Sequence, residues 1–281
     1  MMTAVNLCAV QLCSVPDVEA NLAVIEIQLQ QLDQSAINLV VLPECCLYFG
    51  GQDKAQLTVA KNNLDNGYIH QALSHLSRQY NAYLVVGSVP AVEHLDEEKF
   101  ANRSLVFSPQ GENIAHYDKI HLFDVDVEDS EKSYRESATT KRGQAVSDVE
   151  LPFAHLGLTI CYDLRFAELF RQLTKKGADI ITVPAAFTRV TGQAHWEVLL
   201  RARAIENQVY IIAAGQEGVH ENSRETWGHS MIISPWGEVL AQLPTGVGMI
   251  TAPFSKEEIS KVRGNIPVAQ HNQFITEFNK S

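Results

Sequence analysis

Cys161 is the residue of this chain whose position most strongly suggests chemistry. It directly follows an apolar run at 156–160 and precedes a segment in which apolar residues recur with the spacing of a helix. A thiol at a strand-to-helix turn projects out of the sheet, near the partial positive charge of a helix N-terminus, which favours the nucleophilic thiolate. The alternative is a small core residue, because free cysteine is among the most buried residue types.

Two other segments supply a carboxylate and an ammonium group. Glu44 follows Pro43 at the end of the apolar run 37–42, and Lys119 lies in the apolar and aromatic segment 116–123. Taken singly, Glu44 could be a solvated loop acid and Lys119 a surface charge with a buried stem. A base, a cation and a thiol together are what thiol-mediated hydrolysis of an amide requires.

These segments resemble those of a known family. Leu-Pro-Glu at 42–44, Lys-Ile-His-Leu-Phe-Asp at 119–124 and Ile-Cys-Tyr-Asp-Leu-Arg-Phe at 160–166 are similar to the Glu–Lys–Cys signatures of the nitrilase superfamily of carbon–nitrogen hydrolases. Segments 191–206 and 228–237 extend the resemblance over nearly the whole chain, in family order. Within the superfamily, the chain resembles the branch that holds the deaminated glutathione amidases and omega-amidases.

The resemblance implies a cysteine-dependent amidase that converts a small carboxylate-bearing amide to an acid and ammonia through a thioester. Cys161 would attack the carbonyl carbon and Glu44 would act as the general base. Lys119 and the backbone N–H of Tyr162 would stabilise the oxyanion. We expect burial to raise the pKa of Glu44, so that it can hold a proton between steps. This chemistry needs no cofactor and no metal.

Glu136 lies in an acidic segment without periodicity, residues 124–147, which is longer than an ordinary connection and is therefore predicted to be functional. By resemblance, Glu136 matches a second glutamate near the triad and could hold Lys119 or the substrate amide in position. The alternative is one more acid in an acidic loop.

Arg165 and Thr191 are candidates for binding a substrate carboxylate. Arg165 follows Cys161 by about one helical turn, and a guanidinium there could bind a carboxylate through two hydrogen bonds. Its alternative role is an ion pair with Asp163 or Glu168. Thr191 could donate its hydroxyl to the same carboxylate, or could cap the helix that follows it.

The branch resemblance favours deaminated glutathione as the substrate. An omega-amidase acting on α-ketoglutaramate or α-ketosuccinamate is the alternative. A non-catalytic interaction module is a more distant possibility, because no position of the Glu–Lys–Cys set is replaced.

The composition and net charge of the chain limit which partners and which cellular compartment are expected. The 281 residues are 46% hydrophobic and carry a formal net charge of −11, which suits one α/β domain over residues 1–281. Without a Lys/Arg stripe, neither nucleic acid nor a membrane is expected as a partner. Five cysteines without framework spacing and an N-terminus without a basic leader predict reduced thiols in the cytoplasm. The expected partners are a small-molecule amide and, by resemblance, further copies of the chain in a homodimer or higher homo-oligomer.

The elements that must position these residues alternate along the chain, which predicts an α/β fold with helices on the faces of a sheet. The resemblance makes this a four-layer αββα sandwich, in which two such units pack sheet on sheet. Strands are predicted at 5–12, 39–42, 83–86, 104–107, 113–117, 156–160, 180–183, 210–214, 230–234 and 239–243, and helices at 18–32, 69–80, 166–176 and 196–204. The tail after Pro267, with Phe274 and Phe278, is expected either to pack on a partner or to fray.

Overall fold

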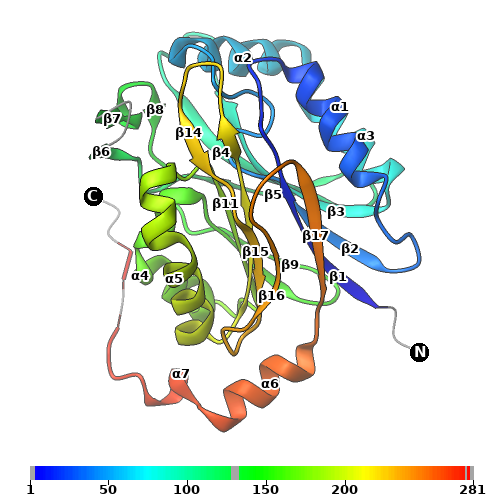
Figure 1. Cartoon of the computed structure of the whole chain (residues 1–281), viewed down its shortest axis with the longest axis vertical. Coiled ribbons are helices and arrows are strands. Elements are labelled where there is room, and N and C mark those ends of the chain that lie inside the picture. The colour runs from blue at the N-terminus through cyan, green and yellow to red at the C-terminus, as the bar shows by residue number, and fades with distance from the viewer. Residues whose placement is uncertain (1–3, 128–132, 276, 279–281) are drawn as a thin grey trace.

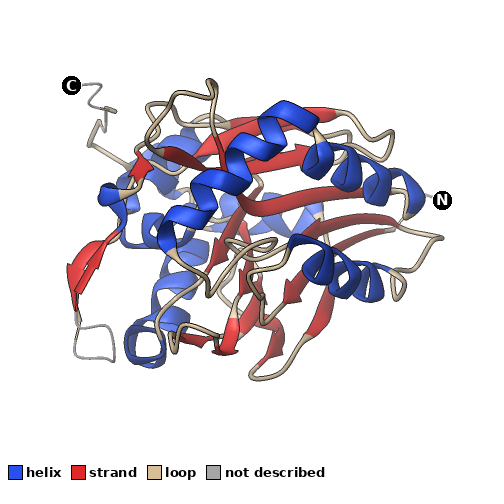
Figure 2. Ribbon diagram, turned by 90° about the horizontal axis from the view of Figure 1, so that it is seen from above, coloured by secondary structure: helices blue, strands red, loops and turns tan. Residues whose placement is uncertain are grey.

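Two β-sheets pack face to face, and helices cover the outer face of each sheet (Figure 1, Figure 2). The structure is a computed structural model that describes residues 4–127, 133–275 and 277–278. The predicted four-layer αββα sandwich is therefore confirmed.

Within the described residues the first sheet has seven strands in the order β17-β1-β2-β3-β4-β5, with β8 beside β4. Strands β1, β2 and β3 are parallel to one another. The pairs β17–β1, β3–β4 and β4–β5 are antiparallel, whereas β8 runs parallel to β4. The bounds are β1 Val5–Gln11, β2 Ile37–Val41, β3 Ala82–Ala91, β4 Phe100–Phe107, β5 Asn113–Asp118, β8 Thr140–Lys141 and β17 Gly248–Pro253.

The second sheet, counted over the same residues, has six strands in the order β16-β15-β12-β11-β10-β9, with a parallel centre formed by β10, β11 and β12. Its bounds are β9 Asp148–Glu150, β10 His155–Leu158, β11 Ile180–Ala185, β12 Tyr210–Gly215, β15 Ser230–Ile233 and β16 Val239–Leu243. Two small antiparallel pairs lie apart from both sheets: β6 Asp124–Asp126 with β7 Ser133–Arg135, and β13 Glu217–Val219 with β14 Glu225–Trp227.

The helices divide between the two outer layers (Figure 2). The first sheet carries α1 Val18–Leu29, α2 Asp53–Asn66 and α3 Tyr68–Gln79, and the second carries α4 Ala167–Lys175 and α5 Arg189–Asn207. Two short 3-10 helices, η1 Glu136–Ala138 and η2 Cys161–Arg165, lie near the sequence-predicted site residues. After β17 the chain continues through α6 Lys256–Asn265 and α7 Val268–His271. No helix among the described residues is long and apolar enough to span a membrane.

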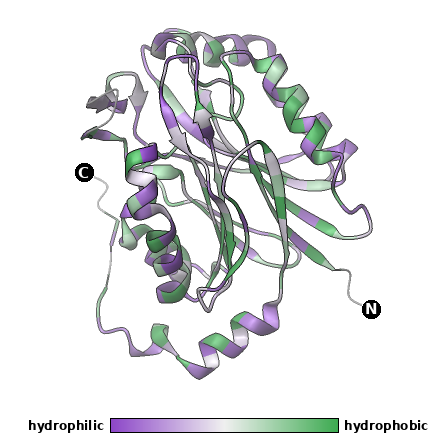
Figure 3. Cartoon of the chain, viewed as in Figure 1, coloured by the Kyte–Doolittle hydropathy of each residue, from purple (hydrophilic) through white to green (hydrophobic). Residues whose placement is uncertain are grey.

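Strand β1 shows how the two faces of the first sheet are buried. Leu7 and Ala9 belong to the core between the sheets, whereas Cys8 and Val10 pack with α1 and α3. Because successive side chains of a strand point to opposite faces, an almost continuous apolar run fits a sheet covered on both sides. Figure 3 shows this pattern as hydrophobic residues concentrated on the central strands.

The local signals for helix ends are confirmed at two positions. The Asp17 carboxylate accepts a hydrogen bond from the Ala20 N–H at 3.0 Å and so caps α1. Gly177 follows the end of α4 with a φ of +107°, a conformation that glycine adopts without steric cost.

Several elements differ from the sequence-based prediction. The helices α2 and α6 and the strands β13, β14 and β17 were not predicted. The segment 124–147 was predicted as a loop, but it forms β6, β7, η1 and β8, while residues 128–132 lie outside the described part. In the tail Phe274 is exposed, whereas Phe278 packs against the core between the sheets.

Candidate active site

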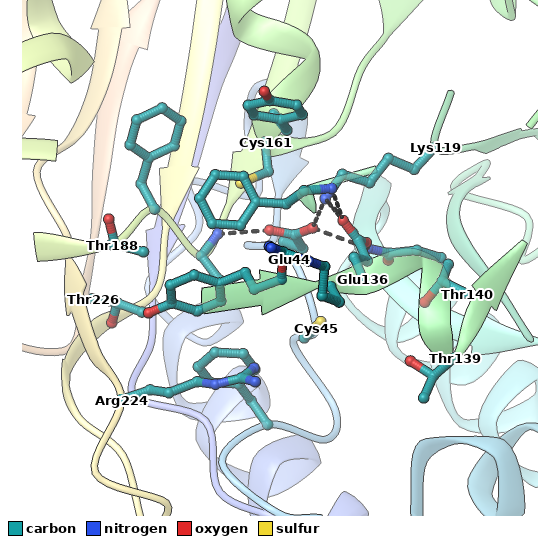
Figure 4. Close-up of a pocket in the computed structure, with 18 of the residues that line it drawn as sticks. Glu44, Cys45, Lys119, Glu136, Thr139, Thr140, Cys161, Thr188, Arg224 and Thr226 are labelled. Atoms are coloured by element: carbon teal, nitrogen blue, oxygen red, sulfur yellow. Dashed lines mark hydrogen bonds and ion pairs between the residues drawn. The ribbon is translucent and has the colours of Figure 1, made fainter. Parts of the chain in front are cut away.

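The structure brings Glu44, Lys119, Cys161 and Glu136 together where the two sheets meet (Figure 4). Glu44 lies in the turn that follows β2, and Lys119 directly follows β5, so both come from the first sheet. Cys161 opens η2 after β10 of the second sheet. The cluster therefore depends on the packing of one sheet against the other.

Lys119 is buried between two carboxylates. Its Nζ lies 2.8 Å from Glu44 Oε1 and 2.9 Å from Glu136 Oε2, and its side chain is only 2% exposed. Burial alone would lower the pKa of Lys119, but the charges of Glu136 and Glu44 raise it well above its usual value. Lys119 is consequently an ammonium ion over the whole physiological pH range.

The Glu44 carboxylate accepts hydrogen bonds from the nitrogen atoms of three residues. Lys119 and the Asn102 amide donate to Oε1, at 2.8 and 2.9 Å, and the Ala186 N–H donates to Oε2 at 2.8 Å. Burial raises the pKa of Glu44, but the Lys119 charge and the hydrogen bonds from Lys119, Cys161 and Ala186 outweigh burial and lower it. The predicted raised pKa is therefore wrong, because these partners stabilise the charged form. Glu44 is ionised and can accept a proton.

The thiol of Cys161 contacts the Glu44 carboxylate. Its φ is +50°, the left-handed region that a residue with a Cβ rarely adopts, which gives the sharp turn between β10 and η2. Burial raises its pKa, and the Glu44 charge raises it further against the opposing effect of Lys119. The expectation that this turn favours the thiolate is wrong for the resting protein, because burial and Glu44 dominate. A thiol in contact with an ionised carboxylate is nonetheless the pairing that base-assisted attack requires.

Asn102 links the two carboxylates and was not identified from the sequence. Its Nδ2 donates to Glu44 Oε1 at 2.9 Å and to Glu136 Oε1 at 3.2 Å. The only signal in the sequence was an amide that follows two apolar residues, Phe100-Ala101, just before a predicted strand. Asn102 lies on β4, next to β5, whose end carries Lys119.

Glu136 comes from the acidic segment that sequence analysis singled out. Its Oε2 accepts a hydrogen bond from the Phe123 N–H at 2.7 Å, and both of its oxygens bind Lys119. The same segment returns to the site at Gly143, whose N–H donates to the Lys119 carbonyl at 2.8 Å. A Cβ at residue 143 would lie 2.0 Å from the Asp118 carbonyl oxygen, so this close approach requires glycine.

Arg165 lies beside the cluster, packed on aromatic rings. Its guanidinium is 5.1 Å from the Phe187 ring centre and 5.9 Å from that of Tyr162, and its Nη1 lies 3.1 Å from His195 Nδ1. The alternative partner Asp163 is occupied elsewhere. Both rings line the cavity that Cys161 also lines, whereas Arg165 packs against these rings and is not itself among the lining residues.

The Asp163 carboxylate stabilises the turn that carries Cys161. It accepts hydrogen bonds from the Tyr117 hydroxyl at 2.8 Å and from the Ile160 N–H at 2.8 Å, and its Oδ1 lies 2.7 Å from His121 Nδ1. It is fully buried. These bonds fix the backbone on the N-terminal side of Cys161.

Thr191 lines the same cavity from the first turn of α5. The capping role considered for it belongs to Thr188, whose Oγ1 accepts a hydrogen bond from the Thr191 N–H at 3.4 Å. The two hydroxyl oxygens are 2.8 Å apart. The Thr191 hydroxyl is thus positioned at the wall of the cavity.

The cavity has a volume of about 350 Å³. This lies within the roughly 300–1,000 Å³ that is usual for small-molecule sites. Its wall combines the charged cluster with aromatic and polar side chains that sequence analysis did not identify: Phe49, Gln56, Phe123, Tyr134, Arg224 and Thr226. A buried charged base with an aromatic rim suits a small polar substrate.

Comparison with known proteins identifies the family. Residues 6–264 match the family model described as carbon-nitrogen hydrolase. The chain belongs to this family. The amidase class expected for this carbon–nitrogen hydrolase is confirmed by its relatives.

The relatives and the solved structures agree along nearly the whole length. The chain is 43% identical over 275 residues to a deaminated glutathione amidase of Yersinia enterocolitica, covering 98% of this chain and 95% of that protein. It is 37% identical over 230 residues to the omega-amidase NIT2 of Homo sapiens, covering 82% and 81%. The crystal structure of the C. elegans NitFhit protein superposes with a TM-score of 0.91 at 34% identity, covering 99% of this chain and 68% of that one.

Proposed function

We propose that this carbon–nitrogen hydrolase cleaves a small carboxylate-bearing amide, with deaminated glutathione as its first candidate substrate. The observation that carries this proposal is the contact of the Cys161 thiol with the ionised Glu44, which Lys119 binds at 2.8 Å. The relative from Yersinia enterocolitica, named a deaminated glutathione amidase, supports the choice of substrate.

In the first half of the reaction, Glu44 takes the proton of the Cys161 thiol as sulfur attacks the amide carbon. Negative charge then develops on the carbonyl oxygen. Lys119 and the backbone N–H of Tyr162, the residue after the nucleophile, stabilise that charge. Glu44 gives its proton to the departing nitrogen, the C–N bond breaks, and a thioester remains on Cys161.

In the second half, water opens the thioester. Glu44 accepts a proton from the water, whose oxygen attacks the thioester carbon, and the proton is returned to the Cys161 sulfur as the C–S bond breaks. The carboxylic acid leaves and the site is restored. The burial of Lys119 makes its charge effective, because no bulk water screens it.

Glu136 and Asn102 act as positioning residues in this scheme. Glu136 binds Lys119 through both of its oxygens, at 3.1 and 2.9 Å. Asn102 donates to both carboxylates and so fixes their spacing. The lysine is thereby held in one place, which limits the reorganisation needed when the oxyanion forms.

The leaving group depends on which substrate is used. Deaminated glutathione contains peptide amides and no primary amide, so its hydrolysis releases an amine. The sequence-based expectation of ammonia fits only the omega-amides, α-ketoglutaramate and α-ketosuccinamate. These remain the second candidate, supported by the identity to the omega-amidase NIT2.

The test is a kinetic comparison of deaminated glutathione, α-ketoglutaramate and a neutral amide of equal size. We expect kcat/KM to be highest for deaminated glutathione and lowest for the neutral amide. A higher value for α-ketoglutaramate would make the protein an omega-amidase. Failure to hydrolyse any of the three would refute the proposed function.

We also propose that the chain forms one hydrolase domain over residues 1–281 and assembles into a homodimer or higher homo-oligomer. Three apolar side chains on one side of α5 are exposed by 46–69%: Val190, Val198 and Ile205. Covering such a face with a second copy would remove it from water. Light scattering should give at least twice the chain mass of 31.2 kDa, and Val198→Glu should shift it toward the monomer.

A cytoplasmic location is the compartment that we propose. All five cysteines lie in the described part of the chain and are free thiols. Free thiols persist in reducing compartments. Microscopy of a tagged full-length chain tests this, and an extracytoplasmic signal would contradict it.

A further inference from the structure

The guanidinium of Arg224 reaches the cavity from a part of the chain that the proposed mechanism does not use. Arg224 lies in the tight turn that joins β13 to β14, where the His220 N–H donates to the Arg224 carbonyl at 2.9 Å. The side chain is half-buried and lines the cavity. Its guanidinium lies over the Tyr134 ring, 5.5 Å from the ring centre.

Two charged side chains near Arg224, both in the described part of the chain, form ion pairs with other residues. Glu225 lines the cavity beside it, and its Oε2 is bound by Arg189 Nε at 2.6 Å. Arg135, at the end of β7, also lines the cavity and binds Asp126 at 2.9 Å. An aromatic ring stacks on the face of a guanidinium, whereas a carboxylate binds along its edge. The Tyr134 ring and an anionic ligand can therefore contact Arg224 at the same time.

Figure 4 shows Arg224 on the far side of Glu44 from Cys161. This placement indicates which end of the cavity each half of the substrate occupies. The acyl group stays on Cys161, whereas the departing nitrogen must face Glu44, which gives it a proton. A leaving group that continues beyond that nitrogen extends away from Cys161, and Arg224 lies on that side. Arg165, by contrast, follows the Cys161 turn itself.

We propose that Arg224 binds a carboxylate on the amine half of the substrate. The preferred substrates are then amides that are acidic at both ends, an acyl group with its own carboxylate joined to an amino acid or short peptide. This inference rests on the proposed function and makes its substrate class more specific. Deaminated glutathione has a carboxylate in each half, whereas the omega-amides release ammonia and have none on that side.

The test compares three substrates that share the α-ketoglutaryl group: deaminated glutathione, its analogue with a C-terminal carboxamide, and α-ketoglutaramate. The parent protein should show a kcat/KM about 10- to 100-fold higher for deaminated glutathione than for the carboxamide analogue, as expected for one charge-assisted contact. In Arg224→Met this preference should disappear. The ratio of kcat/KM for deaminated glutathione over α-ketoglutaramate should fall by a similar factor, and Arg224→Lys should recover part of it.

Arg135→Met is the matched control, because it removes the same charge from the same rim. It should leave both ratios within about threefold of the parent. The comparison of free carboxylate with carboxamide needs no substitution, so the expected preference can be tested even if Arg224→Met does not fold, and Arg224→Lys then tests the residue.

Equal kcat/KM values for the free carboxylate and the carboxamide in the parent would overturn the inference. An equal loss on all three substrates in Arg224→Met would do the same. If the parent hydrolyses α-ketoglutaramate while the ratios do not respond to residue 224, only this inference fails. If the parent hydrolyses none of the three, the proposed function fails with it.

Discussion

Glu44 accepts a hydrogen bond from the Ala186 backbone N–H at 2.8 Å, across 142 residues of chain. Glu44 follows β2 of the first sheet, and Ala186 directly follows β11 of the second. Cys161 also comes from the second sheet, so the proposed base and nucleophile meet only when the sheets are packed together. Mispositioning of either sheet should therefore impair activity before it unfolds the protein.

Cys161→Ala should abolish hydrolysis while leaving a folded protein, because the substitution removes only the attacking sulfur. Peptide-resolved mass spectrometry with a slow substrate should find the acyl adduct on Cys161 of the parent, and none on Cys45 or Cys46. Near-normal turnover by the alanine variant would disprove the nucleophile assignment.

Lys119→Arg should also fail, although it keeps the charge. The Lys119 ammonium occupies a narrow position between Glu44 and Glu136, and a planar guanidinium is too wide to take it. Removing one such oxyanion donor typically costs on the order of a hundredfold or more in rate. The kcat of the purified variant checks this, with its thermal unfolding as a control. Turnover within a few-fold of the parent would mean that Lys119 is only structural.

The sequence was sufficient to predict residues whose position follows from the chain's local pattern. Glu44 and Cys161 each end an apolar run, and Lys119 lies in an aromatic segment, so neighbouring residues mark all three. Asn102 and Arg224 could not be found in this way. The importance of Asn102 arises from two carboxylates brought to it by strand pairing, and that of Arg224 from a turn folded over a distant cavity.

The protonation states were mispredicted for a related reason. The raised pKa expected for Glu44 considered burial alone, and the thiolate expected at Cys161 considered the turn alone. In the folded protein each group is next to the other, and Lys119 is next to both. Paired charges decide the outcome, and their distances become known only with the tertiary structure.

Glu44→Gln should lower the pKa of the Cys161 thiol, because the Glu44 charge raises it while Lys119 lowers it. The rate of iodoacetamide labelling, followed by mass spectrometry of the Cys161 peptide, should therefore rise at a lower pH in the variant. Turnover should be lost at the same time, since the base is gone. An unchanged or higher midpoint for labelling would contradict the assigned contact.

The pH dependence of kcat/KM should report the lowered pKa of Glu44. The base is active when deprotonated, so activity is present above its pKa and lost as the pH falls through it. The acid limb should then lie below about pH 4.3, the usual value for glutamate. Asn102→Ala removes a donor that favours the charged form, so it should move this limb upward. An acid limb well above that value in the parent would show that Glu44 is not the ionised base.

Arg165→Met tests recognition of the acyl carboxylate. If Arg165 and Thr191 bind it, the parent should prefer charged substrates over neutral amides of equal size, because a neutral analogue would leave a half-buried guanidinium without its partner. The variant should raise KM for the charged substrate and narrow this gap. Equal kcat/KM for charged and neutral substrates in the parent would assign Arg165 to packing on Phe187 and Tyr162.

The pairing of β1 with β17 has a consequence for synthesis on the ribosome. β1 is made long before its antiparallel neighbour, Gly248–Pro253. Until then one side of β1 is an open edge that another nascent chain could pair with. A chain whose translation stops before residue 248 would keep that edge permanently, so early termination should yield aggregates and not a smaller working enzyme.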